Sequence, residues 1–201
     1  MTRKTVLCLI IVALWEGAVY IFSADASDFG MLKYQLAARY SARTSFVIFC
    51  ALLLGTGIYG LKGIYGTEDR RRFFVLFILM LAFNHFIHFI FIVLNYRAQA
   101  LTLLEGKNFP GALGYMLLML APVYLWNKKT LTKSVQLQLY GFFLFIVIIF
   151  LVTYVGRFSK ELPMMSSPLV YGCFLASMSV LIILNLYRFI KENRSGLLIK
   201  R

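Results

Sequence analysis

The chain has 201 residues, of which 61% are hydrophobic and 14% are charged, and its formal net charge is +13 at pH 7. Soluble domains are about half apolar and about a quarter charged, so a water-soluble globule of this length could not bury so much apolar surface. The composition excludes a soluble enzyme, a disordered tail and a disulfide-stapled secreted module, and it indicates a protein covered in part by lipid.

Six apolar stretches are each long enough to cross a bilayer, which takes roughly 17 to 25 residues as a helix. The alternation of apolar and polar residues that is typical of membrane β-barrels is absent from the sequence. We therefore expect an all-α integral membrane bundle of six transmembrane helices, in a single domain over residues 1–201. The predicted spans cover residues 5–23, 44–61, 73–96, 110–126, 137–156 and 168–187.

The first predicted span has two interpretations. Ala24-Asp25-Ala26, directly after the apolar run, resembles the cleavage site of a secretory signal. The aromatic residues just before that site, Tyr20 and Phe22, and the full length of the span favour a helix that is retained. Cleavage would leave five helices and an N-terminus outside the cytoplasm.

Lysine and arginine are distributed unevenly among the polar segments. If successive spans alternate in direction, about two thirds of these residues lie on the side of the N-terminus. Because basic residues gather on the cytoplasmic side of membrane proteins, we expect both termini to be cytoplasmic. The positive charge then reflects topology and attraction to anionic lipid, not a nucleic-acid partner. Arg70-Arg71-Arg72, before the third span, is interpreted as such an anchor.

Two patterns that resemble chemical motifs are interpreted as packing features. Gly55-Thr56-Gly57-Ile58-Tyr59-Gly60 matches the dinucleotide-binding fingerprint, but a transmembrane span contains it and no strand precedes it. Glycines at this spacing let helices approach closely, so we expect close packing and a helix end. Cys8, Cys50 and Cys173 lie in apolar runs and form no metal-type pair, so we expect them to act as small hydrophobic residues.

The clearest functional signal is a set of polar side chains inside the spans, because a charged group at the bilayer centre costs roughly 2.5 to 3.5 kcal/mol. At about 100° per residue, Asn84, His88 and Asn95 share one stripe of the third span. His85 lies on the flank of this stripe. Glu16 lies at a compatible depth in the first span, so we expect it to contact His85 or His88 in the bundle interior.

This buried polar cluster has two interpretations that the sequence leaves open. One is a hydrogen-bonded network that fixes the register of the helices. The other is a site for a ligand, a proton or a cofactor, because histidine ligates metal or haem iron and relays protons near neutral pH.

A further signal is the order of several features between residues 40 and 190. Arg70-Arg71-Arg72 leads into Ala82-Phe83-Asn84-His85-Phe86-Ile87-His88, a later span carries Gly114-Tyr115 and Pro122, and the last contains Ser167-Pro168-Leu169-Val170-Tyr171 and Tyr187-Arg188. This order resembles the ferric reductase-like transmembrane domain family, most closely its haem-binding membrane subunits of the MsrQ (YedZ) type.

The resemblance implies a multi-pass protein of the bacterial inner membrane that holds haem b and passes electrons to a partner. His85, or else His88, stands where that family has a haem ligand. These are the two histidines of the chain, and they lie within one turn of one helix, so they cannot both be axial ligands of one iron. A second ligand would then be a tyrosine or a methionine, or would come from another subunit.

Three functions therefore follow from the sequence. The first is a divergent electron-transfer membrane subunit, with or without haem. The second is a small transporter or proton relay that uses Glu16 and His85 or His88, although the sequence shows neither an inverted repeat nor a pair of broken helices, which are usual in transporters. The third is a non-catalytic accessory subunit. Short loops favour a membrane or soluble partner subunit, and the lack of a nucleophile motif or zinc site disfavours hydrolysis.

Overall fold

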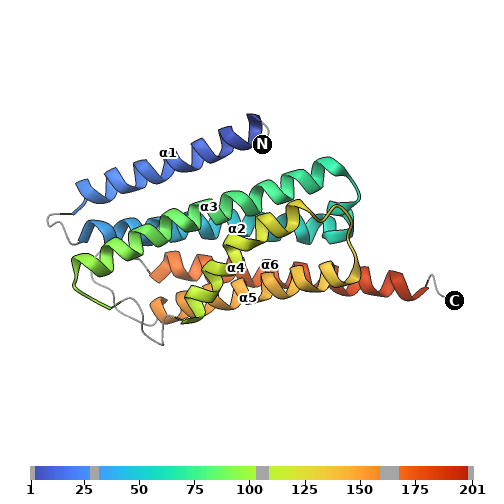
Figure 1. Ribbon diagram of the computed structural model, residues 1–201. Helices are drawn as coiled ribbons and strands as arrows, with labels where there is room; N and C mark the ends of the chain where they lie inside the picture. The colour runs from blue at the N-terminus through green and yellow to red at the C-terminus, as the bar shows by residue number, and fades with distance from the viewer. Residues whose placement is uncertain (1–2, 28–31, 103–108, 159–167, 199–201) are drawn as a thin grey trace. The chain divides into compact units, whose positions relative to one another are not determined.

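The computed structural model of the protein describes residues 3–27, 32–102, 109–158 and 168–198. Within these ranges the chain forms six α-helices and no strand. The helices are α1 (Arg3–Asp25), α2 (Leu32–Tyr65), α3 (Glu68–Ala98), α4 (Phe109–Trp126), α5 (Lys133–Phe158) and α6 (Pro168–Leu198) (Figure 1). The connections at residues 103–108 and 159–167, including Ser167, lie outside the described residues.

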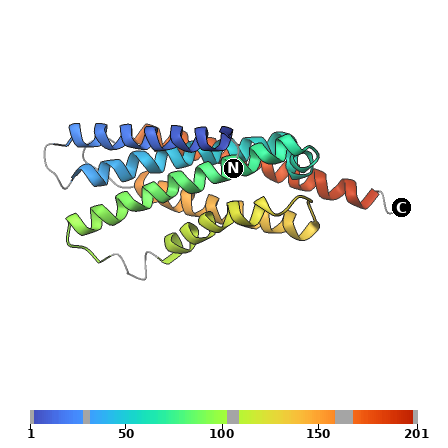
Figure 2. The same ribbon diagram turned by 45° about the horizontal axis from the view of Figure 1, so that its top comes forward.

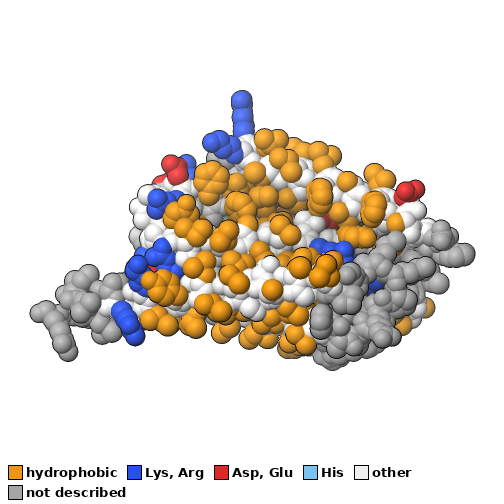
Figure 3. Space-filling view, turned by 180° about the vertical axis from the view of Figure 1, so that it is seen from behind, with side chains coloured by type: hydrophobic (Ala, Val, Ile, Leu, Met, Phe, Trp, Pro, Cys, Tyr) orange, Lys and Arg blue, Asp and Glu red, His pale blue; other side chains and the backbone are white. Residues whose placement is uncertain are grey.

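All six helices are long and apolar enough to cross a membrane. Large hydrophobic side chains are exposed along each of them, and they dominate the helical surface visible in Figure 3. Such a surface suits a lipid environment and not water. The prediction of a multi-pass, all-helical membrane protein is confirmed, whereas the cytoplasmic position of the termini stays a prediction.

The helices extend beyond several of the predicted spans. Helix α2 begins at Leu32, although the predicted span begins at residue 44, and α6 continues to Leu198, although the predicted span ends at residue 187. The predicted ends were placed at charged residues such as Arg43 and Arg188, which are costly inside lipid. A helix satisfies its own backbone hydrogen bonds and can continue past the edge of the bilayer, so charged residues do not end it.

The helices divide into two compact units. The first unit contains α1, α2 up to Phe49, α3 from Val75 and α4. Within it, the Tyr20 ring of α1 stacks on Tyr34 of α2 and on Phe91 of α3, with ring centroids 6.2 and 6.1 Å apart. Helix α1 therefore packs on both α2 and α3, as Figures 1 and 2 show.

The second unit contains α2 from Cys50, the start of α3 up to Phe74, α5 and α6. Helices α5 and α6 pack against each other. Their buried apolar side chains include Phe143, Tyr154, Tyr171 and Met178. The three cysteines of the chain are free, as expected for small residues in apolar runs.

Helix α2 is broken inside the second unit. Gly60 has φ 70° and ψ 163°, a conformation that interrupts the helix and that residues with a Cβ rarely adopt. A Cβ on Gly57 would lie 2.5 Å from Leu184 Cδ2, and a Cβ on Gly60 would collide with the Glu192 carboxyl group. The prediction of close packing is confirmed at Gly57 and Gly60 and is wrong at Gly55, where nothing lies within 4 Å of an added Cβ. The predicted helix end is a break within a longer helix.

Candidate functional site

Glu16 is the most deeply buried acidic side chain that the structure describes, with 1% of its surface exposed. It lies on the inner face of α1 within the first unit. The Ser41 hydroxyl group of α2 is the polar neighbour of its carboxyl group. Neither carboxyl oxygen has a hydrogen-bond partner among the described residues. The structure therefore buries an acid without the partners that usually accompany one.

Asn84 of α3 is also completely buried. Its amide nitrogen donates to the backbone carbonyl of Ser41 at 3.2 Å and to the Ser45 hydroxyl at 2.8 Å. Because a carbonyl oxygen can only accept, these contacts fix which end of the amide is nitrogen. The remaining oxygen, Oδ1, and the Ser41 hydroxyl are buried and lack partners among the described residues.

A hydrogen-bonded chain connects this group to one histidine. The Ser45 hydroxyl, which accepts from Asn84, lies 2.9 Å from Nδ1 of His85. The Glu16 carboxyl group lies beside the Ser41 side chain, and the Ser41 backbone carbonyl, Asn84 and Ser45 connect that position to His85. The expected contact of Glu16 with His85 or His88 stays a prediction. The serines stand four residues apart on α2, so they share one face of that helix.

Tyr115 of α4 covers both histidines. Its ring centroid lies 4.5 Å from that of His85 and 6.1 Å from that of His88, and the two imidazole centroids are 5.2 Å apart. His88 is buried and His85 is half-buried. A haem held between two histidines needs one imidazole on each face of the porphyrin. These rings instead lie side by side against one tyrosine, so they do not fit such a haem within this chain.

Asn95, the outermost residue of the predicted stripe, belongs to a different contact. It is half-buried near the end of α3 and accepts a hydrogen bond of 2.7 Å from Gln99, one turn further on. The structure thus brings Glu16, Asn84 and the two histidines into one connected group with α2 and α4, and it leaves Asn95 in a local pair.

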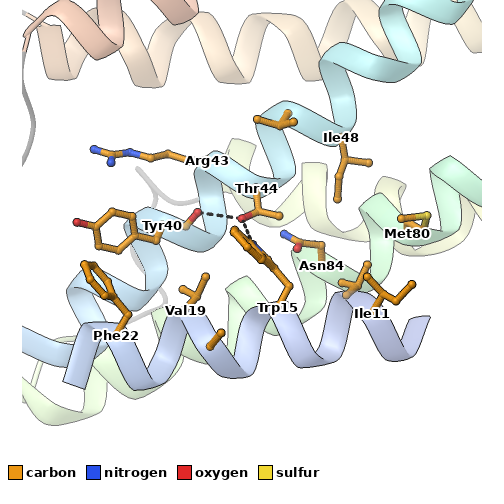
Figure 4. A pocket seen from close by; sticks show the side chains of 13 residues that line it. Ile11, Trp15, Val19, Phe22, Tyr40, Arg43, Thr44, Ile48, Met80 and Asn84 are labelled. Carbon is orange, nitrogen blue, oxygen red and sulfur yellow. Dashed lines mark hydrogen bonds between the residues drawn. The ribbon is translucent and has the colours of Figure 1, made fainter. Parts of the chain in front are cut away.

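A cavity of about 630 Å³ lies beside this group, between α1, α2 and α3. Its walls are mostly apolar, and Asn84 from α3 lines it together with Trp15 from α1 and Thr44 from α2 (Figure 4). Trp15 Nε1 donates to the Thr44 hydroxyl at 2.9 Å. Glu16 does not line the cavity itself, although Val12 and Val19, about one turn before and after it on the same buried face of α1, do. Asn84 is the member of the polar group that reaches the cavity wall.

The second unit contains another buried acid, Glu192 of α6, which is 7% exposed. Its carboxyl oxygens accept hydrogen bonds from the Lys62 backbone N–H at 3.0 Å, from the Gln136 amide at 2.9 Å and from the Tyr140 hydroxyl at 3.3 Å. These donors come from α2 and α5. Glu192 is therefore a structural acid with several partners.

Glu192 and Arg188 together bridge the break in α2. In a continuous helix the Lys62 N–H would donate to the Ile58 carbonyl. Here the N–H donates to Glu192, and the Ile58 carbonyl accepts from the Arg188 guanidinium, which also donates to the Gly57 carbonyl at 2.9 Å. Two residues one turn apart on α6 thus satisfy both sides of the interruption.

Arg70-Arg71-Arg72 lies at the start of α3. Arg71 and Arg72 each form an ion pair with Glu68, at 2.8 and 2.9 Å. Arg70 lies over the Tyr59 ring and donates to the Gly63 carbonyl. These contacts suit the interpretation of the triplet as an anchor at the end of a helix.

Three residues of these groups, Ser41, Ser45 and Glu192, are not among those predicted from the sequence. The spacing of the two serines could have indicated a polar face on the second span. Glu192 is an isolated acidic residue in a basic segment, four positions after Arg188. This isolation is the feature of the sequence that could have singled it out.

No family model, no curated protein and no solved structure matches this chain. The relationship to ferric reductase-like membrane subunits, and with it electron transfer, haem binding by His85 or His88 and a place in the inner membrane, stays a prediction based on the residues given above.

Proposed function

We propose that the protein moves cations across the membrane, as a small transporter or a proton relay, and that Glu16, Ser41 and Asn84 form its ion site. The observation that carries this proposal is the buried oxygen atoms of these three side chains, which have no hydrogen-bond partners among the described residues. Native proteins pair nearly all their buried polar atoms, so a group of unpaired ones on three helices needs a cause.

Stability alone gives no reason to keep Glu16. An acid within a membrane span is costly unless it is paired, and beside Glu16 stands a single serine hydroxyl, that of Ser41, with no described cation. A leucine or methionine at this position would fill similar space without a polar group. Function is therefore the better explanation for this acid, and ions that cross membranes commonly bind at such intramembrane acids.

The hydrogen-bonded chain supports the same proposal. Asn84 and Ser45 join the unpaired oxygens to His85, whose imidazole has one nitrogen that can donate and one that can accept a hydrogen bond. Polar side chains that connect different helices are what a relay requires.

Reconstitution into liposomes tests the proposal. A potassium diffusion potential set by valinomycin would drive cations inward, with a lumenal pH-sensitive dye reporting protons and radioactive sodium reporting alkali cations. We expect flux above that of empty liposomes, and we expect Glu16→Gln to reduce it to the empty-liposome rate because the ion site loses its carboxylate.

Glu192→Gln is the matched control, because it neutralises a buried acid outside the proposed ion site. Its flux per folded protein, measured after size-exclusion chromatography, should equal that of the unmodified chain. Undiminished flux in Glu16→Gln, or flux no greater than that of empty liposomes in the unmodified chain, would contradict the proposed function.

A further inference from the structure

We propose that the Glu16 cluster binds one dehydrated alkali-metal cation. This inference deepens the proposed function by naming the class of ion. It rests on the proposed function only in stating that the bound ion is the one transported. Binding itself can be measured without any flux.

The cluster offers oxygen atoms as ligands for an ion. On Glu16, Ser41 and Asn84, the buried atoms without a hydrogen-bond partner among the described residues are the two carboxyl oxygens, the hydroxyl oxygen and the amide oxygen. All four are oxygens, from one carboxylate, one hydroxyl and one amide. Hard cations prefer such oxygen ligands, whereas transition metals favour imidazole and thiolate. The described residues also contain no group of three or more His, Cys, Asp or Glu side chains that could hold a metal ion.

The position of these atoms is consistent with a preformed site. Helices α1, α2 and α3 contribute one residue each, and all three side chains are buried, with 1% or less of their surface exposed. The two hydrogen bonds from the Asn84 amide nitrogen fix that side chain, so its oxygen is oriented before an ion arrives. The Ser41 hydroxyl faces the Glu16 carboxyl group. Fixed ligands lower the ordering cost of binding.

The charge of the cluster selects a monovalent ion. Glu16 supplies one negative charge when ionised, and no described cation pairs with it. A single positive charge would make the cluster neutral, whereas a divalent ion would leave a net charge buried in the membrane, at a cost of several kcal/mol on the usual scale. Each unpaired oxygen would also gain the partner that the protein does not provide.

Thermal unfolding of the full chain in detergent tests the inference. The midpoint temperature of unfolding would be measured at increasing concentrations of sodium, potassium or lithium chloride, with N-methylglucamine chloride keeping the ionic strength constant. An ion that binds only the folded chain raises the midpoint as its concentration rises. We expect a saturable increase with at least one alkali cation and none with N-methylglucamine, and the comparison of the three salts identifies the preferred ion.

Variants assign the effect to the cluster. We expect the increase to disappear in Glu16→Gln and to be retained in Glu192→Gln. Ser41→Ala, which removes one of the four oxygens, should weaken the apparent affinity roughly tenfold. If Glu16→Gln does not fold, Ser41→Ala and isothermal titration of the unmodified chain decide the question.

Equal midpoints in all the salts would overturn the inference, and so would an unchanged increase in Glu16→Gln, which would indicate an adventitious effect of salt. Proton flux that depends on Glu16 without alkali-cation binding would reject the inference and keep the proposed function. Alkali-cation binding without flux would keep the inference and reject the proposed function.

Discussion

Glu16 and Glu192 are both buried glutamates on apolar helices, but their surroundings differ completely. Glu192 accepts hydrogen bonds from three donors on α2 and α5. Glu16 lies beside one serine hydroxyl and accepts none from the described residues. Burial alone therefore does not assign a role to an acid in this protein. The donors around it decide whether it holds the fold together or remains available to a ligand.

The same contrast separates the two units. In the second unit, the Lys62 N–H and the Gly57 and Ile58 carbonyls, which the break at Gly60 sets free, are bonded by side chains of α6. In the first unit, regular helices surround side-chain oxygens that have no such partners. The arrangement at Gly60 in the second unit is that of a structural joint. The arrangement around Glu16 in the first unit is that of a binding site.

The largest expected effect is the difference in stability between neutralising the two acids. Glu192→Gln should lower the free energy of unfolding by about 2 kcal/mol, because an amide group would face donors that now bond to a carboxylate. Glu16→Gln should cause no loss, because no hydrogen bond is removed. Equilibrium unfolding in mixed detergent micelles measures both, and equal losses would remove the distinction between a structural and a functional acid.

The next largest effect on stability is expected at Gly60, the break in α2. Gly60→Ala should destabilise the protein by about 1 to 3 kcal/mol, because alanine strains a backbone with positive φ and its Cβ would collide with Glu192. Gly55→Ala is the matched control, since nothing lies within 4 Å of a Cβ there. It should leave stability equal or slightly higher. The same unfolding assay applies, and similar values for both variants would argue against a rigid break.

The smallest effect concerns the link between Asn84 and His85. Ser45→Ala should cost about 0.6 kcal/mol, the average for a hydrogen bond between membrane helices, while slowing proton flux because His85 is then disconnected from Asn84. Ser179→Ala, which removes a hydroxyl bonded to the Leu175 carbonyl on an exposed face, should leave flux unchanged. Equal flux in both variants would exclude His85 from the route.

The sequence predicted the number of helices and part of the cluster for a clear physical reason. Apolar length and the cost of polar groups in lipid are properties that can be read residue by residue, and they single out Glu16, Asn84, His85, His88 and Asn95. Glu16, Asn84 and His88 are buried in the structure, whereas His85 and Asn95 are half-buried. Which side chain lies beside Glu16 could not be predicted in the same way, because that depends on how α1, α2 and α3 pack together; the neighbour is Ser41 of α2.

Ser41, Ser45 and the break at Gly60 illustrate what the sequence leaves undetermined. Serine is tolerated on almost any face of a membrane helix, so its presence gives little information until a neighbouring helix brings a partner. The glycine pattern indicated close packing, but an interruption at Gly60 requires Arg188 and Glu192 from a helix more than 120 residues later. Long-range partners of this kind cannot be inferred from local patterns.

The dependence of α2 on α6 has a consequence for biosynthesis. The chain is made from its N-terminus, so α2 enters the membrane long before Glu192 is synthesised. Until then the Lys62 N–H and the Gly57 and Ile58 carbonyls have neither Glu192 nor Arg188 to bind. The nascent α2 can meet this need by continuing its own helical bonding through Gly60. The interrupted form would then arise only once the last helix has been translated, which makes it a late step in assembly.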